Sequence, residues 1–432
     1  MENPTLRLSF GRQQKIFMRK EMKRSKNVCM INYSNYSMDP RVRRTAETIA
    51  ALPGYKVSVL TIKLSDRPKR YTLNRVNVRE LNITKYQGKT SIRYLLSYAF
   101  FMTLAFFACT GLLLRRSIDI VHVHNMPNFI VFAAVIPRII GKKLILDIHD
   151  TMIETYVAKF PKNVFRPISM CINALLRMEE FLSCKIAHRV ICVNHVQKDV
   201  LLKRGIPEDK IIILLNVPDP ERLKSPQVQK KYPGTINQFN LIYHGTMAKR
   251  LGIDFAIKAV AQIRLSIPDV TFHVIGEGDD LEEFMKLSRN LHASEFVRFS
   301  GKNIPFEELV GILKTMDLGL VPNRRSDATE LMLPVKMLDC IALGIPVIVP
   351  RLKAIEHYFT DDMVTFFDPE NIDSLMDAIR FAYGNRAKIK EKAKNAYRFM
   401  DTYKWETHKF ELVNLYQSMV EKQQLTIETE AH

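Results

Sequence analysis

The stretch NLIYHGT, residues 240–246, shows the pattern from which the fold of this chain can be predicted. Its first five residues are mostly apolar and indicate a strand that is buried on both faces, and a helix-like stretch follows. Gly245, at the end of the strand, lets the backbone approach a ligand. A buried strand followed by a helix is the repeating unit of parallel α/β sheets.

The same unit recurs on both sides of this stretch. Comparable runs lie at 27–33, 56–62, 118–123, 143–148, 189–193 and 210–214, and then at 240–244, 270–275, 297–300, 318–321, 346–349 and 364–367. Two such series predict two doubly wound, Rossmann-like domains. The predicted division of the chain is a basic extension at 1–26, an N-terminal domain at 27–215, a proline-containing linker at 216–239 and a C-terminal domain at 240–385.

The composition excludes several classes of protein. The 432 residues are 47% hydrophobic and 25% charged, as in a globular protein, which excludes a disordered or fibrous chain. Lys and Arg number 64 against 45 Asp and Glu, and this net charge of +19 favours anionic partners. Nucleic acid is the weakest of these, because the basic residues lack the aromatic interleaving of single-strand binders. The six cysteines have no zinc-binding spacing, and we interpret them as small buried hydrophobic residues in a reducing compartment.

Residues 95–114 form an apolar segment without a charge, flanked by Arg93, Arg115 and Arg116. The segment is long enough to cross a membrane, but a span here would place strands of one sheet on opposite sides of the bilayer. Two alternatives remain: a buried crossover helix, or a helix in the membrane interface whose basic flanks contact lipid phosphates. The aromatic content and the net charge favour the second. We therefore expect a cytoplasmic protein, peripherally associated with the inner face of an anionic membrane.

Acidic residues and a histidine follow the predicted strand at 143–148. Asp147, His149 and Asp150 lie at its carboxyl end, and Glu154 comes four residues later. Open α/β sheets bind ligands beyond the carboxyl ends of their strands, so His149 could donate to a substrate hydroxyl or shuttle a proton. The alternative is that Asp147 caps the following loop and His149 only packs against its neighbours.

Basic residues follow the glycine after the strand at 240–244. Lys249 and Arg250 lie on a loop or first helical turn and are expected to point into one crevice, where they suit phosphate binding. After the strand at 270–275 come Gly276 and Glu277 without a GxGxxG pattern, which argues against a dinucleotide-dependent dehydrogenase. Gly276 either lets a base stack near the strand end or belongs to an ordinary turn.

The segment LPVKMLDCIALGIPV, residues 333–347, predicts a helix that begins at Pro334. Free amides in its first turn, near Val335 and Lys336, can bind a diphosphate. Burying Asp339 on this apolar helix without a partner is costly, so we interpret it as an acceptor for the hydroxyls of a ribose.

Six segments, in order along the chain, resemble the retaining glycosyltransferases of family 4, which have the GT-B fold. The segments are DPRVRR at 39–44, VHVHN at 121–125, LDIHD at 146–150, YHGT at 243–246, LPVKMLDCIALGIPV at 333–347 and WE at 405–406. The resemblance implies two Rossmann-like domains facing each other across a cleft, with helices over 386–432 that cross back to the first domain.

The resemblance also implies a reaction: transfer of a sugar from a nucleoside-diphosphate sugar with retention of configuration, without a metal or another cofactor. Lys249 and Arg250 would stabilise the departing diphosphate, and His149 would contact the transferred sugar or the acceptor. The donor nucleotide would be held by Gly245, Thr246, Gly276, Glu277, Pro334, Val335, Lys336 and Asp339. The acceptor side would include Asp39, Arg41, Asp150 and Glu154.

The chain departs from the family pattern at the sugar site. The family often has two glutamates separated by seven residues, but here the second position is Asp339 and the first is Leu331. We therefore assign the donor sugar to the nearby Asp327 and Glu330. The loop lysine of the family is Leu251 in this chain, so phosphate binding would rest on the basic pair just before it.

Three hypotheses about function follow. The first is a glycosyltransferase of polysaccharide or glycolipid biosynthesis that acts on a lipid-linked or membrane-held acceptor. The second, motivated by the departures, is a catalytically silent GT-B subunit that partners another glycosyltransferase at the membrane. The third, another GT-B enzyme such as a nucleotide-sugar epimerase, does not account for the apolar segment.

Overall fold

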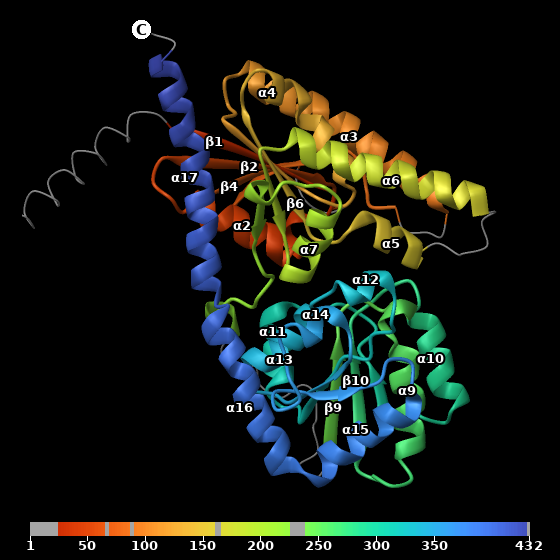
Figure 1. The fold of residues 1–432 in the computed structure, drawn as a ribbon. Coiled ribbons are helices and arrows are strands. Elements are labelled where there is room, and N and C mark those ends of the chain that lie inside the picture. Colours follow the sequence, from red (N-terminus) through yellow and green to blue (C-terminus); the bar gives the residue numbers. More distant parts are fainter. Residues whose placement is uncertain (1–24, 65–68, 87–89, 160–165, 225–237, 430–432) are drawn as a thin grey trace, which may run out of the picture.

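The structure is a computed structural model, and it describes residues 25–64, 69–86, 90–159, 166–224 and 238–429. Within them the chain forms two α/β domains, drawn one above the other in Figure 1, each built on a largely parallel sheet covered by helices. The predicted fold class is confirmed. Most of the basic extension at 1–26, and 225–237 of the predicted linker, lie outside the described residues.

The first domain holds an eight-stranded sheet in the order β3-β4-β2-β1-β5-β6-β7-β8. Its strands are β1 (Lys26–Asn32), β2 (Tyr55–Ile62), β3 (Arg70–Leu73), β4 (Val76–Leu81), β5 (Ile120–His124), β6 (Lys143–Ile148), β7 (Arg189–Cys192) and β8 (Ile211–Ile213). Neighbouring strands are parallel apart from the antiparallel pair β3 and β4 at one edge. The strand order changes direction between β1 and β5, which is where open α/β sheets bind their ligands.

Helices cover both faces of this sheet. One face packs against α2 (Pro40–Ala50) and the long C-terminal helix α17 (Trp405–Thr429). The other packs against α3 (Ser91–Leu114), η2 (Asn128–Ala134), α4 (Val135–Ile139) and α6 (Arg166–Ile186). The remaining helical segments are η1 (Tyr36–Met38), α5 (Met152–Lys159), α7 (His195–Lys203), η3 (Glu208–Lys210) and α8 (Pro220–Leu223).

The second domain holds a six-stranded parallel sheet in the order β11-β10-β9-β12-β13-β14. Its strands are β9 (Phe239–His244), β10 (Val270–Ile275), β11 (Val297–Phe299), β12 (Leu318–Leu320), β13 (Val347–Pro350) and β14 (Thr365–Phe367). Its helical segments are η4 (Lys249–Leu251), α9 (Ile253–Ile263), α10 (Leu281–Asn290), α11 (Phe306–Leu313), α12 (Asp327–Glu330), α13 (Val335–Ala342), α14 (Lys353–Glu356) and α15 (Ile372–Gly384). All residues of β9 and β10 are buried, so the loops that follow them start from a rigid base.

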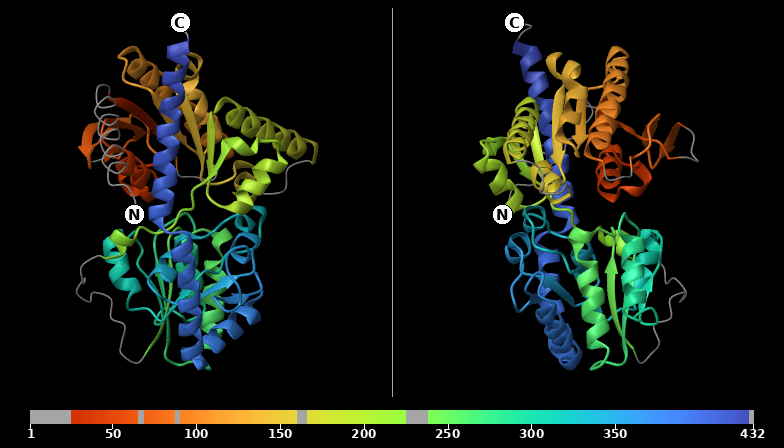
Figure 2. Two further views of the ribbon diagram at one scale, coloured as in Figure 1. Left: turned by 60° about the vertical axis from the view of Figure 1, so that its left-hand side comes forward. Right: turned by 90° about the vertical axis from the view of Figure 1, so that its right-hand side faces the viewer.

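The last two helices tie the domains together. α16 (Arg386–Thr402) packs against α13 of the second domain, and α17 then runs along the first domain and packs against α2 (Figure 2). Trp405, the first residue of α17, is buried, and its ring centre lies 4.0 Å from the Arg44 guanidinium of α2. An aromatic ring and a cation at this distance attract each other, so this contact helps to hold α17 on the first domain.

The apolar segment at 95–114 lies within α3. This helix connects β4 to β5, which belong to one sheet, and it therefore runs along one face of that sheet. Its length and composition alone would allow it to cross a membrane, yet only 22% of its most apolar window is buried. The alternative of a buried crossover helix thus describes its inward side, while its outward side is exposed.

Candidate active site

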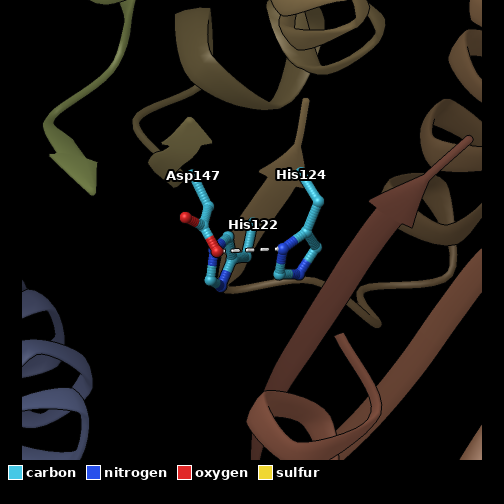
Figure 3. A group of neighbouring side chains, drawn as sticks. All are labelled: His122, His124 and Asp147. Atoms are coloured by element: carbon cyan, nitrogen blue, oxygen red, sulfur yellow. Dashed lines mark hydrogen bonds and ion pairs between the residues drawn. The ribbon is translucent and has the colours of Figure 1, made fainter. Parts of the chain in front are cut away.

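Polar side chains gather at the carboxyl edge of the first sheet. His122 and His124 come from β5 and Asp147 from β6, and the strand register places His124 beside Asp147. Figure 3 shows both imidazoles next to the Asp147 carboxylate. All three side chains are buried, so they must satisfy their polar atoms largely through one another and through nearby residues.

The Asp147 carboxylate is held by Arg41 of α2. Nη2 of Arg41 donates to Oδ1 at 2.7 Å, and its Nε donates to Oδ2 at 3.1 Å. Burial alone would raise the pKa of Asp147, but Arg41 and the neighbouring His149 hold that pKa well below its usual range. Arg41 and Asp147 therefore form a buried, bidentate ion pair that fixes the carboxylate in place.

This carboxylate orients His149. Nε2 of His149 lies 3.1 Å from Oδ2 of Asp147, and the backbone N–H of His149 donates to Oδ1 of Asn125 at 2.7 Å. With Nε2–H donating to the carboxylate, Nδ1 is the ring nitrogen left for another partner. The side chain of His149 is 20% exposed, whereas those of His122 and His124 are fully buried. Of these three imidazoles, His149 is the one that a bound molecule could reach.

Burial lowers the pKa of each of the two buried histidines below its usual value, which favours the neutral imidazole. Nδ1 of His122 lies 2.6 Å from the hydroxyl oxygen of Tyr416 on α17. The possible ligand atoms of His122, His124 and Asp147 lie within 4.8 Å of one another, a spacing that could hold a metal ion. Both oxygens of that carboxylate already accept hydrogen bonds from Arg41, which supplies positive charge there. That no metal is needed stays a prediction.

Two of the predicted acceptor-side residues, Arg41 and Glu154, are held in ion pairs inside the first domain. Glu154 pairs with Arg204, which also donates to Glu180 at 2.8 Å. The side chains of Arg41 and Glu154 are 7% and 11% exposed, so both contact mainly protein groups.

The other two acceptor-side residues remain accessible near His149. Asp39 is the N-cap of α2, where its side chain accepts from the Val42 N–H at 3.1 Å. Burial would raise the pKa of Asp39, but the nearby His149 and two hydrogen bonds lower it. Asp150 is half-buried, and its carbonyl accepts from Nδ2 of Asn125 at 2.7 Å. Asp39, His149 and Asp150 therefore form the accessible part of this edge.

In the second domain, glycines bring the loops after β9 and β10 into backbone contact. Gly245 and Gly276 have φ angles of 116° and 139°, which L side chains rarely adopt. A Cβ on Gly276 would lie 2.0 Å from the carbonyl oxygen of Gly245, so residue 276 has to be glycine. Thr246 of the first loop and Glu277 of the second are exposed. Thr246 and Glu277 are thus accessible to a bound molecule at the carboxyl edge of the sheet.

Two cations lie beside these loops. Nζ of Lys336 donates to the Tyr243 hydroxyl at 2.7 Å and lies 4.0 Å from the centre of that ring. Burial and the charge of Arg250 lower the pKa of Lys336 to about 7. Within the part of the chain that the structure describes, no ion pair involves Arg250 or Lys336. Two mutually repelling cations without an acidic partner form a site that an anion would complete.

Lys249 differs from its neighbour Arg250. Its Nζ lies 2.7 Å from Oε1 of Glu283 on α10, and its side chain is 57% exposed. The sequence predicts that the two basic residues point into one crevice, but the structure gives Lys249 a partner on α10. Both residues belong to η4, and successive residues of a 3₁₀ turn point about 120° apart.

The helix predicted to begin at Pro334 begins one residue later. Pro334 is extended, with ψ at 122°, and caps α13, whose first residues are Val335 and Lys336. Asp339 on α13 is buried, which raises its pKa to about 7, and Arg44 and Arg222 oppose that shift. A carboxyl that titrates near neutrality and has cations nearby suits hydrogen bonding to a polar ligand group.

The predicted donor-sugar residues lie on the short helix α12, which contacts α5 of the first domain. Asp327 is exposed. Glu330 accepts from the Lys353 N–H at 2.7 Å and pairs with Arg325 at 3.2 Å. The next residue, Leu331, accepts at its carbonyl from Nδ2 of Asn194 at 2.8 Å, which is a hydrogen bond between the two domains.

Sequence reasoning did not identify three residues that shape this site. Tyr416 is separated by 294 positions from His122, its hydrogen-bond partner, and no local pattern indicates the contact. Asn194, the N-cap of α7, likewise bonds across the domains. Arg44 lies within the quoted DPRVRR segment, where its stacking on Trp405 could have been suspected from the two motifs together.

Two family descriptions match the chain, one in each domain. Residues 41–222 match Glycosyltransferase Family 4, and residues 238–385 match Glycosyl transferases group 1. These two segments contain most of the strands of both sheets and the loops described above.

Curated relatives include two mannosyltransferases. The GDP-mannose-dependent alpha-(1-6)-phosphatidylinositol monomannoside mannosyltransferase of Mycolicibacterium smegmatis is 27% identical over 136 residues, which are 31% of this chain and 35% of that protein. The chitobiosyldiphosphodolichol beta-mannosyltransferase of Debaryomyces hansenii is 23% identical over 321 residues, 69% of this chain and 66% of that protein. The chain thus spans about a third of the length of the first relative.

Solved structures share the fold. Sucrose-phosphate synthase from Thermosynechococcus elongatus has a TM-score of 0.75 at 16% identity, covering 92% of this chain and 100% of that one. HepE from Anabaena, in complex with UDP and glucose, has a TM-score of 0.65 at 14% identity, covering 91% and 100%. WaaG, a glycosyltransferase involved in lipopolysaccharide biosynthesis, has a TM-score of 0.65 at 19% identity, covering 90% and 99%.

Proposed function

The chain belongs to the group 1 glycosyltransferases of family 4, and on that premise we propose that it transfers a sugar from a nucleoside-diphosphate sugar to a membrane-held acceptor, with retention of configuration. The observation that carries the proposal is the pair Arg250 and Lys336, two cations that have no acidic partner among the described residues and lie beside the loops after β9 and β10. A diphosphate has the charge and the oxygen atoms to complete that pair.

In the proposed reaction the bond between the anomeric carbon and the diphosphate breaks, and negative charge grows on the leaving group. Arg250 and a protonated Lys336 stabilise that charge, together with free amides at the start of α13. The acceptor hydroxyl attacks from the same face of the sugar, and an oxygen of the leaving phosphate takes its proton. This route needs no side chain as a base. Asp339 holds the ribose hydroxyls.

On the first domain, His149 contacts the transferred sugar or the acceptor. Its Nδ1 accepts a hydrogen bond from a sugar hydroxyl, because its Nε2–H is committed to Asp147. The ion pair between Asp147 and Arg41 keeps the imidazole in this orientation before any substrate arrives. Asp39 and Asp150 border the same space on the acceptor side.

The acceptor is proposed to be lipid-linked or a saccharide held at the inner face of a membrane, in polysaccharide or glycolipid biosynthesis. The names of two curated relatives specify acceptors with a phosphatidylinositol or a diphosphodolichol group. The net charge of +19 and the exposed side of α3 support an anionic membrane surface as a partner. We propose that the reaction needs no cofactor and no metal, and that the nucleotide sugar acts as the donor substrate.

The second candidate, a silent subunit that partners another glycosyltransferase, is favoured by one observation. Leu331 stands where the family often has a glutamate, and its carbonyl is tied to Asn194 of the first domain. A GtfA subunit of a peptide N-acetylglucosaminyltransferase of Streptococcus parasanguinis is 25% identical over 137 residues, 32% of this chain and 24% of that protein.

The test is turnover of radiolabelled UDP-glucose, UDP-N-acetylglucosamine and GDP-mannose with a bacterial lipid extract as the acceptor source. We expect one donor to release its nucleoside diphosphate and to label the lipid fraction. Proton NMR of the product should show the anomeric configuration of the donor. An inverted product would contradict the retention of configuration but not the sugar transfer itself. If no donor is turned over by a protein that is folded, the silent-subunit hypothesis replaces the enzyme.

A further inference from the structure

The outward side of α3 carries large apolar side chains. Phe101, Ala105 and Cys109 of this helix are buried against the first sheet. On the opposite side of the helix, Phe107 is 68% exposed, and Leu114, two turns later, is 81% exposed. A crossover helix of a soluble domain normally places polar residues on that side, so this side needs another explanation.

The neighbouring helix α6 repeats the arrangement. Its Glu180 and Cys184 are buried, whereas Leu175 and Met178 on the other side are exposed. α3 and α6 both bury their inward sides in one apolar cluster on the same face of the sheet, and both contact η2 between them. Figure 1 shows them on one side of the first domain.

We group the exposed apolar side chains of α3, of α6 and of the end of α4 under one name, the α3–α6 face. It consists of Ile92, Leu95, Leu96, Phe100, Phe107, Leu114, Ile139, Ile140, Met170, Leu175, Met178, Phe181 and Leu182. These are 13 of the 18 large hydrophobic residues that are exposed in the described part of the chain, so the exposure is concentrated here. A surface of this kind on a soluble domain marks a place of interaction.

The charges on this surface identify the partner. Exposed charged side chains on α3 and α6 and directly after α3 are all basic: Arg93, Arg115, Arg116, Arg177 and Lys185. The acidic residues of α6 turn inward, where Glu180 accepts from Arg204 at 2.8 Å and Glu179 contacts Asn128. A second copy of this chain would oppose these cations with the same cations, which disfavours a symmetric dimer. Apolar side chains among basic ones suit an anionic lipid bilayer.

We propose that the α3–α6 face docks on an anionic lipid bilayer, with α3 and α6 lying in the interface and neither of them crossing it. The apolar side chains enter the boundary between headgroups and acyl chains, while the arginines and the lysine contact lipid phosphates. The proposal rests on the membrane-held acceptor of the proposed function, which it extends by assigning the binding surface to two helices. The apolar segment at 95–114 does not define this surface alone, because α6 also contributes to it.

Vesicle flotation tests this surface. The probes are phosphatidylcholine vesicles with and without 30% phosphatidylglycerol, and the variants are Phe100→Glu/Phe107→Glu on α3 and Leu175→Glu/Met178→Glu on α6. Each pair should weaken binding to the anionic vesicles by about 10-fold or more, since two apolar side chains that would enter the bilayer become charged. Leu265→Glu is the matched control: Leu265 is 92% exposed but lies on the second domain, and binding should not change.

The outcomes distinguish a failure of the membrane surface from a failure of the proposed reaction. Unchanged binding of the α6 variant would overturn the role of α6, and unchanged binding of both variants would overturn the α3–α6 face. A wild-type dimer in light scattering that Phe100→Glu dissociates, together with no vesicle binding, would assign the face to a second copy and overturn the bilayer. Far-UV circular dichroism and the melting temperature of each variant, compared with the wild type, show that it is folded. If vesicle binding behaves as expected while no sugar is transferred, only the proposed reaction fails.

Discussion

The carboxyl edges of the two sheets, the first edge and the second edge, differ in how they could receive a ligand. On the first domain, Asp147 is already bonded to Arg41 and His149, so this edge is complete without a ligand. On the second domain, Arg250 and Lys336 repel each other, and the pKa of Lys336 falls to about 7. A completed network positions a substrate, whereas an uncompensated pair of cations binds an anion. The difference supports our proposal that the leaving diphosphate binds to the second domain.

The largest effect is expected from breaking the network of the first edge. Asp147→Ala leaves Arg41 buried without its partner, and removing one member of a buried ion pair typically costs about 3–5 kcal/mol. Urea denaturation of this variant should show that loss. The matched control is Asp199→Ala on the exposed side of α7, whose stability should stay close to wild type. Equal stability of the two variants would contradict a preformed first edge.

The next largest effect is expected at the second edge, where Arg250 and Lys249 should differ. Arg250→Ala should lower turnover of the active donor by about 100-fold or more, as expected when a contact to developing charge is lost. Lys249→Ala is the natural control, since that lysine already pairs with Glu283 and should lose only a few-fold at most. Steady-state kinetics of both variants at saturating donor give the comparison. If Lys249→Ala were the more damaged variant, the assignment of the two basic residues would be reversed.

A smaller effect concerns pH. Free Lys336 has a pKa of about 7, and a bound diphosphate raises it, so above pH 7 the complex holds more protons than the free protein. Affinity for the nucleoside diphosphate should therefore fall as the pH rises, by up to about 10-fold per unit. Calorimetry in buffers of different ionisation enthalpy measures the proton uptake directly.

Three variants identify the group responsible for this pH dependence. Lys336→Met should abolish the uptake, and Lys286→Met, an exposed lysine on α10, should leave it intact. Asp339 also has a pKa of about 7, so Asp339→Asn separates its contribution from that of the lysine. Uptake that survives in Lys336→Met would assign the titration to another group.

The smallest effect tests the link between the C-terminal helix and the first edge. Tyr416→Phe removes the hydrogen bond to His122, and one such bond typically contributes about 1 kcal/mol to stability. Tyr397→Phe, on an exposed position of α16, should change nothing measurable. A loss of the same size in both variants would show that the bond to His122 has no specific role.

The fold could be predicted because its signals are local. The runs at 240–244 and 143–148 are buried strands, and the glycine after β9 is required by backbone geometry. The site could be predicted only in part, because its partners are distant in sequence. Arg41 and Asp147 are 106 positions apart, and nothing near either residue specifies their ion pair. Lys249 and Arg250 are adjacent, yet tertiary contacts separate their side chains.

The orientation of α3 is another feature that the sequence alone could not determine. Its apolar composition indicated either burial or a membrane, and the sequence could not decide which residues face the sheet. The packing of Phe101 and Cys109 decides it, and leaves Phe107 and Leu114 outward. The contribution of α6 was hidden because its inward glutamates give it an ordinary amphipathic composition.

The most direct test of the account is a thermal-shift screen of UDP, GDP, ADP, CMP and dTDP on the wild type, Arg250→Ala and Asp339→Ala. A ligand at a hundred times its dissociation constant stabilises a protein by about 2.7 kcal/mol, which such a screen detects. We predict that one nucleoside diphosphate raises the melting temperature of the wild type and that both variants lose most of this shift. No shift with any nucleotide, or an equal shift in all three proteins, would contradict a diphosphate site on the second domain.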